Sequence, residues 1–188
     1  MGTRESTRPL GRAHLNSPSP DPFYVGPDSP KLLTKQWVGE PGVEAVAILS
    51  IDDMRDTAKY EAYLRPILER LKAVDGRAPV SIFTCQVDPA DPQLAKWLEE
   101  GLSIEVHTIK HPCPLLGAGG DFGEARDTVH RCIDLLAGIP GMSPVAYRMP
   151  CCDSMNSVSP RFFSEIFSKP SPGGNLLKAD SSVFTLLN

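Results

Sequence analysis

Short apolar runs alternate with helix-forming segments from about residue 43 onward, and this alternation limits the folds that the chain can adopt. Most of the apolar runs are shorter than a core helix and rich in Val, Ile and Leu, a composition that favours buried strands. The predicted strands cover residues 44–53, 78–87, 102–111, 144–150 and 175–184. The predicted helices cover residues 58–76, 91–101, 122–139 and 157–167. Strands that alternate with helices predict right-handed crossovers and a parallel sheet or barrel.

Local signals set the expected course of these helices. In the first helix, apolar residues recur at three- and four-residue steps, which gives one apolar face. Pro66 lies inside this pattern and is expected to kink or interrupt the helix, and Gly76 is expected to end it. Asp91 is the expected N-cap of the second helix, with Pro92 in its first turn. We expect His130, in the third helix, to lie on the surface.

Residues 1–41 differ in composition from the rest of the chain, because they hold seven of its 19 prolines with Ser, Asp and Gly between them. A stretch without helical or strand periodicity buries too little apolar surface to offset its ordering entropy. We therefore expect a flexible Pro-rich arm over 1–41 and one folded domain over 42–188. The first residues carry positive charge with no apolar stretch behind it, so we see no signal peptide and assign no compartment.

Charge and hydropathy count against two classes of partner. The formal net charge is -4, whereas a protein that neutralises many phosphates is usually basic. We therefore expect no nucleic-acid partner. No apolar run approaches the roughly 18 residues that a membrane helix needs, so we expect no membrane span.

The five cysteines give no sign of a disulfide framework or a zinc ribbon. Their number is odd and no C-x-x-C spacing occurs, whereas those two kinds of site need paired cysteines. We expect reduced thiols, some of them packed as small hydrophobes. An alternative interpretation combines Cys113, Cys151 and Cys152 with two nearby histidines as a redox or soft-metal site, because Cys113 follows His111 by two residues.

Reactive polar residues stand in the C-terminal parts of three of the predicted strands. They are Asp52 and Asp53 in the first, His107 and His111 in the third, and Arg148 and Pro150 in the fourth. The carboxyl ends of parallel strands form the functional edge of α/β folds. Each group also has a structural interpretation, since adjacent carboxylates often form a turn or cap and a lone histidine is usually structural. Arg148 within an apolar strand needs a carboxylate partner, and Asp52 or Asp53 would serve.

One aspartate and two histidines form a set of three N and O ligands that suits Zn²⁺ or another divalent transition ion. Such an ion lowers the pKa of its bound water towards about 7 and polarises a carbonyl. A second carboxylate nearby can accept the proton of that water. In an extended backbone, Asp52 and Asp53 point to opposite sides and would take these two different roles. The combination predicts metal-assisted hydrolysis of an amide or ester.

At these residues the chain resembles the polysaccharide deacetylase family, also called the NodB-homology domain. SIDD at 50–53 resembles its first motif, T/S-F-D-D; HTIKH at 107–111 resembles its second, H-S/T-x-x-H; and RMPCC at 148–152 resembles its third, R-x-P. The resemblance covers about residues 43–188 and implies an α/β fold, a deformed (β/α) barrel of parallel strands alternating with helices. It also implies a metal-dependent hydrolase that removes acetyl groups from N- or O-acetylated polysaccharides of the chitin, peptidoglycan or xylan type.

The resemblance also implies roles for single residues. Asp52 corresponds to the general base, Arg148 to the residue that orients it, and the backbone N–H of Cys151 to the group that stabilises the tetrahedral oxyanion. Pro150 and Cys152 correspond to the wall of the substrate groove. The implied ligands of one divalent ion, Zn²⁺ before Co²⁺ or Ni²⁺, are Asp53, His107 and His111. The residue between the histidines that would hold their loop by side-chain hydrogen bonds is Thr108.

Three departures from the family pattern leave a second hypothesis open. The pair Cys151 and Cys152 stands where the family usually has a glycine near the second position. No histidine follows His130, although the family's fifth motif supplies a histidine that protonates the leaving amine. Asp180 only poorly matches the fourth motif. We therefore expect a domain that is incomplete at its C-terminus, and the alternative function is a catalytically impaired fragment or a non-catalytic carbohydrate-binding module of the same fold.

Overall fold

Five parallel strands in sequential order, β1-β2-β3-β4-β5, form the sheet around which the chain is built. The structure, a computed structural model, describes residues 48–116, 121–152 and 159–182. The strands are β1 (Leu49–Met54), β2 (Val80–Thr84), β3 (Ser103–Val106), β4 (Ala146–Tyr147) and β5 (Ala179–Asp180). The predicted arm over 1–41 lies outside the described residues. The prediction of a parallel α/β sheet is confirmed, with strands that are shorter than expected.

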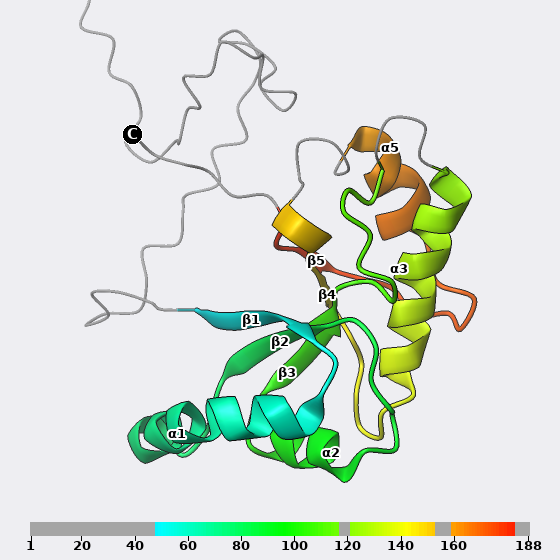
Figure 1. Cartoon of the computed structure of the whole chain (residues 1–188). Helices are drawn as coiled ribbons and strands as arrows, with labels where there is room; N and C mark the ends of the chain where they lie inside the picture. Colours follow the sequence, from blue (N-terminus) through cyan, green and yellow to red (C-terminus); the bar gives the residue numbers. More distant parts are fainter. Residues whose placement is uncertain (1–47, 117–120, 153–158, 183–188) are drawn as a thin grey trace, which may run out of the picture. The chain divides into compact units, whose positions relative to one another are not determined.

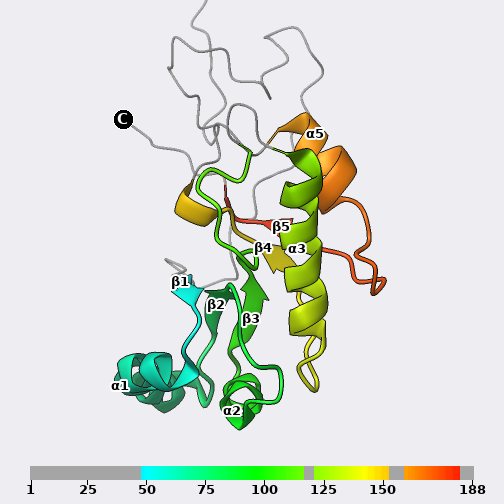
Figure 2. The same ribbon diagram turned by 45° about the vertical axis from the view of Figure 1, so that its right-hand side comes forward.

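Helices connect the strands as predicted (Figure 1). They are α1 (Thr57–Asp75), α2 (Pro92–Glu99), α3 (Phe122–Ala137) and α5 (Pro160–Phe162), with a 3₁₀ turn η1 (Pro150–Cys152) and a π-helical turn η2 (Phe163–Phe167). Right-handed crossovers between strands in sequential order place their helices on one face of a sheet. Figures 1 and 2 show α1 and α2 side by side, while α3 runs along β3 and packs against η2.

The helix ends follow the predicted caps. The Asp91 side chain accepts a hydrogen bond from the backbone N–H of Gln93 at the start of α2. Gly76 ends α1 with φ 72°, and its N–H donates to the carbonyl of Lys72. Of the two expected effects of Pro66, the interruption was wrong, because α1 continues through it as one helix, and the kink stays a prediction. Pro66 is exposed, so water can satisfy the carbonyl that has lost its helical partner.

The core lies between the helices and the face of the sheet that they cover. Its fully buried side chains include Leu68, Ile82, Trp97, Ile104 and Leu136. By strand alternation the opposite face carries mostly polar side chains, among them Ser81 and Ser103, which hydrogen-bond to each other across β2 and β3. Phe83 on the same face is buried.

The first strand differs from the prediction of a fully buried strand. β1 lies at the edge of the sheet, and Ile48 and Leu49 are 85% and 41% exposed. Among the described residues, β1 and β5 do not pair with each other. Closure into a barrel therefore stays a prediction.

Candidate metal centre and active site

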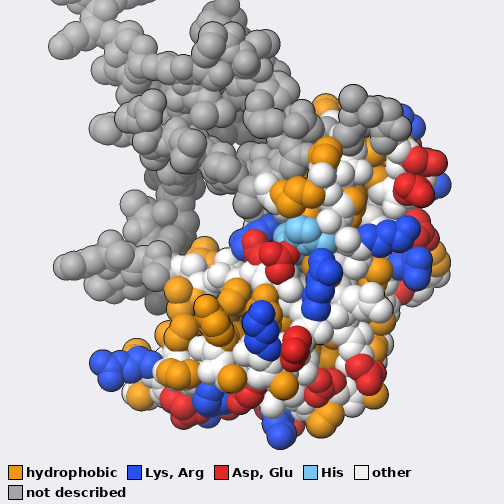
Figure 3. Space-filling model, in the orientation of Figure 1, with side chains coloured by type: hydrophobic (Ala, Val, Ile, Leu, Met, Phe, Trp, Pro, Cys, Tyr) orange, Lys and Arg blue, Asp and Glu red, His pale blue; other side chains and the backbone are white. Residues whose placement is uncertain are grey.

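Asp53, His107 and His111 come together at the carboxyl ends of β1 and β3. Their ligand atoms all lie within 4.8 Å of one another. The Nε2 atoms of His107 and His111 lie 3.3 Å and 2.6 Å from Asp53 Oδ1. Figure 3 shows histidine surface next to carboxylate and basic surface on this face of the molecule. Residues that are more than 50 positions apart in the sequence thus share one site.

The backbone at the site departs from regular strand geometry. The pairing of β1 with β2 shifts register between Ile51 and Met54, and Asp53 within this bulge has φ 64°. The alternation expected for Asp52 and Asp53 in an extended backbone was therefore wrong, since Asp53 has a left-handed conformation. The non-glycine residues with positive φ in the described part of the chain are Asp53, Thr108, His111 and Cys151. Such conformations cost free energy and tend to cluster at functional sites.

His107 is held in one orientation by a hydrogen bond on the far side of its ring. Its Nδ1 lies 2.8 Å from the carbonyl oxygen of Arg148, which can only accept, so Nδ1 carries the hydrogen. The lone pair of Nε2 is then available on the side of Asp53. Burial is the main cause that lowers the pKa of His107, and it favours the neutral imidazole that metals bind.

The loop that carries His111 is anchored by two threonines. Thr108 accepts a hydrogen bond from the N–H of His111 through its side chain at 3.1 Å, in agreement with the role expected for this residue. Thr128 of α3 accepts hydrogen bonds from the backbone N–H groups of Ile109 and Lys110, through its carbonyl and its hydroxyl respectively. Helix α3 therefore positions the first half of the loop.

Asp52 lies beside the triad and is paired with Arg148. Nη1 of Arg148 donates a hydrogen bond of 2.7 Å to Asp52 Oδ1. The guanidinium also donates to the hydroxyls of Ser50 and Ser181, each at 3.0 Å, and its carbon lies 4.1 Å from the centre of the Phe83 ring. Contacts with side chains on β1, on β2 and after β5 thus hold Arg148 in place. Of its two expected carboxylate partners, Asp52 is the one with which it pairs.

The cysteines differ from the prediction of reduced thiols, which was wrong for two of them. Cys113, beyond His111, and Cys151, in η1, form a disulfide with their Cα atoms 6.0 Å apart, a normal separation for this bond. Cys85 and Cys132 are free and buried, as expected for small hydrophobic side chains. Pro150 is buried beside Cys151. The Cys152 side chain lies outside the described part of the structure.

The donor set fits one divalent transition ion. In a tetrahedral site with bonds of about 2.0–2.2 Å, ligand atoms lie roughly 3.3–3.6 Å apart. Nε2 of His107 lies at this distance from Asp53 Oδ1, and Nε2 of His111 lies closer to it. Small side-chain rotations would therefore accommodate an ion. Three protein ligands leave positions open for other molecules, as in catalytic zinc sites.

No protein-family model and no curated protein matches the chain. Two solved structures resemble it, and both are deacetylases. One is the peptidoglycan deacetylase PdaC from Bacillus subtilis, at 23% sequence identity and a TM-score of 0.47, covering 63% of this chain and 54% of that chain. The other is a deacetylase solved with substrate, at 16% identity and a TM-score of 0.41, covering 71% of this chain and 74% of that one. The chain thus spans about half the length of the Bacillus protein.

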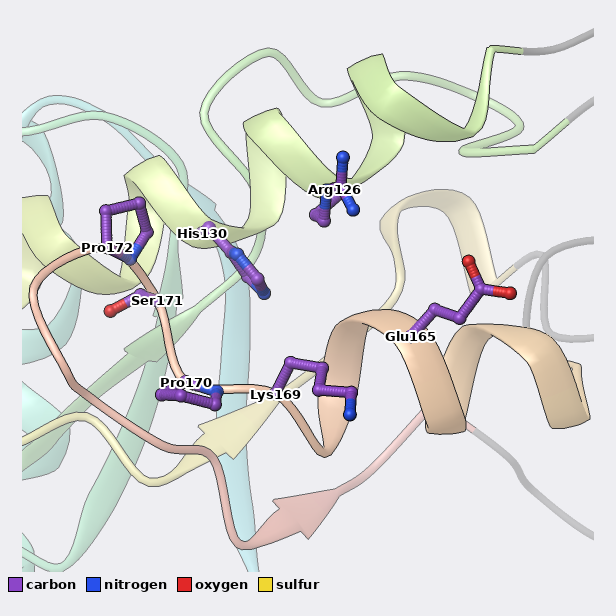
Figure 4. Close-up of a pocket in the computed structure, with 7 residues that line it drawn as sticks. All are labelled: Arg126, His130, Glu165, Lys169, Pro170, Ser171 and Pro172. Carbon is purple, nitrogen blue, oxygen red and sulfur yellow. The ribbon is translucent and has the colours of Figure 1, made fainter.

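Two open clefts differ in their relation to these residues. One cleft, of about 480 Å³, is lined by residues that come shortly after β1, β2 and β3 in the sequence. They are Arg55, Gln86, Val87, Asp88 and Ile109. The other, of about 450 Å³, lies between α3 and the segment that follows α5 (Figure 4). His130 lines this second cleft, and it is buried with its Nε2 donating to the carbonyl of Ile166. Its expected surface position was therefore wrong.

Sequence reasoning missed the two serine partners of Arg148 and the disulfide. Ser50 is part of the SIDD segment, yet nothing in the sequence distinguishes its hydroxyl from other serines. Ser181 follows β5, and no motif or spacing in the sequence indicates its contact with Arg148. The sequence indicates the disulfide only weakly. Cys113 and Cys151 each come shortly after residues that are predicted to belong to the same site. Of the described helices, none is both long enough and apolar enough to cross a membrane.

Proposed function

We propose that the chain is a metal-dependent hydrolase of the polysaccharide deacetylase (NodB-homology) family, which removes acetyl groups from an N- or O-acetylated polysaccharide. The observation that supports it most is the position of Asp52. This second carboxylate is held by Arg148 and directly precedes Asp53 of the metal-binding triad. A ligand set alone is compatible with a structural metal, but an adjacent carboxylate outside the set is what hydrolysis needs.

The proposed metal ligands are Asp53, His107 and His111. A divalent ion held by them, such as Zn²⁺, Co²⁺ or Ni²⁺, supplies Lewis acidity towards a carbonyl oxygen and acidifies water. The hydrogen bond from His107 Nδ1 to the Arg148 carbonyl keeps Nε2 free as a ligand. Mixed N and O donors with open positions suit these ions better than Mg²⁺ or Ca²⁺.

Asp52 is the proposed general base. Its Oδ1 accepts the hydrogen bond from Arg148, while its Oδ2 makes no hydrogen bond to any described residue. This second oxygen can take a proton from water that attacks the acetyl carbonyl. Arg148 is a positioning residue in this scheme, because its contacts with Ser50 and Ser181 fix the direction from which it holds Asp52.

The backbone N–H of Cys151 is the proposed donor to the oxyanion that forms on the acetyl group. Within the described residues this N–H donates to no acceptor. Cys151 follows Pro150 in η1 and has φ 59°. An N–H fixed by such a turn is preorganised for charge that develops during the reaction. Pro150 and Cys152 are the proposed groove residues on the same segment.

Acetate release measured on two substrates tests the proposal. The full chain is freed of metal by a chelator and supplied with Zn²⁺, Co²⁺ or Ni²⁺. It is then incubated with N-acetylated chitin oligosaccharides and with O-acetylated xylan oligosaccharides. We expect metal-dependent acetate release from at least one substrate and none from the His111→Ala variant. Metal binding without acetate release from either substrate class would contradict the assignment as an acetyl hydrolase.

A non-catalytic carbohydrate-binding module is the second candidate. It is favoured by the position of His130, the one described histidine outside the triad, which is bonded to the Ile166 carbonyl on a different cleft. No described histidine is therefore placed to protonate a leaving amine. This alternative predicts binding of acetylated oligosaccharides by calorimetry, with no acetate released in the presence of any of the three metals.

A further inference from the structure

The Cys113–Cys151 disulfide joins two segments that both belong to the candidate site. Cys113 lies two residues beyond the proposed ligand His111, and Cys151 follows Arg148 by three residues. The bond closes a separation of 38 residues that includes all of α3. It therefore connects the third proposed metal ligand to the segment that carries the proposed oxyanion donor.

The His111 segment has few other attachments. His111 has φ 53°, a conformation that a non-glycine residue adopts only when its surroundings enforce it. On its N-terminal side the hydrogen bond to Thr108 provides such a constraint. On its C-terminal side, the Cys113 backbone makes no hydrogen bond to any described residue, and the next buried side chain is that of Leu115. The disulfide is thus the nearest constraint on that side.

The other end of the disulfide lies on a well-anchored segment. Met149 is fully buried, and its N–H donates a hydrogen bond of 2.7 Å to the hydroxyl of Ser182. Pro150 is buried as well. Because Cys151 directly follows these residues, the disulfide fixes the His111 loop to a rigid part of the fold.

We propose that the Cys113–Cys151 disulfide positions His111 as a metal ligand, so that its reduction weakens the metal centre. The inference rests on the proposed metal site. A thiol reductant supplies the chemistry: two thiols give two electrons and two protons to the disulfide, the S–S bond breaks, and two cysteine thiols and one new disulfide are formed. Without the bond, His111 gains conformational freedom that it has to lose again on binding the ion.

The Cys113–Cys151 bond is accessible to a reductant, because both cysteines are exposed. It is the one disulfide among the described residues, and Cys85 and Cys132 are already free thiols that are fully buried. Burial raises the pKa of the Cys132 thiol to about 12 and is the main cause that raises that of Cys85, so neither readily forms a thiolate that would attack the disulfide. A reductant in solution therefore acts at the Cys113–Cys151 bond.

Calorimetric titration of the full chain with Co²⁺ tests the proposal, and the visible spectrum of bound Co²⁺ reports its ligands. The reductant is a water-soluble phosphine, which does not compete for the metal as thiols do. It takes the oxygen of one water to become a phosphine oxide, and the disulfide becomes two thiols. We expect the Co²⁺ affinity to fall about 10-fold to 100-fold on reduction, the range seen when a ligand's supporting contact is lost.

Variants separate positioning from other effects. The Cys113→Ala/Cys151→Ala variant has no thiols at this position that could bind Co²⁺, and we expect it to show the same loss with or without phosphine. Cys132→Ala, which removes a free cysteine and keeps the disulfide, is the matched control and is expected to lose Co²⁺ affinity on reduction as the wild-type chain does. In a His111→Ala background, reduction is expected to leave the Co²⁺ affinity and spectrum unchanged, because the positioned ligand is gone.

Three outcomes would count against the inference in different ways. An unchanged affinity in the reduced, folded wild-type chain would overturn it and leave the proposed function intact. An equal loss in the His111→Ala background would also overturn it, because the disulfide would then act on general stability. If the oxidised chain bound no Co²⁺ at all, the proposed metal centre itself would be refuted, and this inference with it.

Discussion

Arg148, directly after β4, donates a hydrogen bond of 2.7 Å to Asp52 of β1, although β2 and β3 lie between these strands in the sheet. Neighbouring strands are about 4.8 Å apart, so a flat sheet would separate β1 from β4 by roughly 14 Å, well beyond one arginine side chain. The sheet must therefore curl, with the polar face inside. The bond from Arg148 to Ser181 beyond β5 extends the same curvature. This curvature brings Arg148 within reach of Asp52, which directly precedes Asp53 of the triad.

Replacement of Arg148 by Ala is expected to reduce the kcat of acetate release about 100-fold, because a misplacement of the base by about 1 Å has an effect of this size. The Co²⁺ affinity should change little, since His107 bonds to the backbone carbonyl of Arg148, which the variant retains. Arg161→Ala is the matched control, because Arg161 also lies 4.1 Å from a phenylalanine ring but on α5. Unaltered acetate release by the Arg148 variant would refute its positioning role.

Asp52→Asn and Asp53→Asn are expected to separate catalysis from metal binding. Asp52→Asn should retain Co²⁺ affinity and lose about 10²- to 10⁴-fold in kcat, the usual contribution of a general base. Asp53→Asn should lose Co²⁺ affinity itself, because it removes the one carboxylate ligand of the triad. Calorimetry and acetate release on the same preparations measure both effects. A large loss of Co²⁺ affinity in the Asp52 variant would show that the two roles are assigned wrongly.

Most residues of the candidate site could be predicted from the sequence. The carboxyl ends of parallel strands lie at the same edge of a sheet, however the side chains of the core pack. Asp53, His107 and His111 each follow an apolar run, and the structure brings them together. What could not be predicted depends on contacts distant in the sequence. Arg148 and Ser50 are 98 residues apart, and only the curvature of the sheet makes them neighbours.

The local errors also have physical reasons. His130 was predicted to lie on the surface of its helix, but packing of α3 against η2 buries it. Pro66 is exposed on α1, so water can bond to the carbonyl that lost its partner, and a sequence pattern does not reveal this exposure. The disulfide was missed because an odd number of cysteines does not prevent two of them from pairing once the fold places Cys113 near Cys151.

Stability should depend on pH through Glu100, which follows α2 and pairs with Arg65 of α1 at 2.7 Å. The hydrogen bond from Arg65 is the first cause that lowers the pKa of Glu100 below its ordinary value of 4.5. A carboxylate with a depressed pKa in the folded state stabilises the fold above its unfolded pKa, and this contribution is lost as the pH falls through the folded value.

Glu100→Gln is therefore expected to lower the free energy of unfolding by about 1 kcal/mol at pH 7, with a difference from the wild-type chain that shrinks below pH 4.5. Urea unfolding at a series of pH values measures this difference. The neighbouring Glu99→Gln is the matched control, because Glu99 is exposed and pairs with no described cation. If Glu100→Gln lowered the free energy of unfolding equally at pH 7 and at pH 3, the stabilisation by Glu100 would not come from its ion pair with Arg65.

Pro66→Ala is expected to stabilise the chain. Within α1, Pro66 cannot donate the hydrogen bond that its position would otherwise make, and proline in a helix interior costs up to about 3 kcal/mol relative to alanine. The restored bond should raise the free energy of unfolding by about 1–3 kcal/mol, as measured by urea denaturation. Pro92→Ala is the matched control and should change stability little, because Pro92 occupies the first position of α2, where an N–H has no helical acceptor. A neutral or destabilising effect of Pro66→Ala would mean that the proline ring makes contacts that offset its cost.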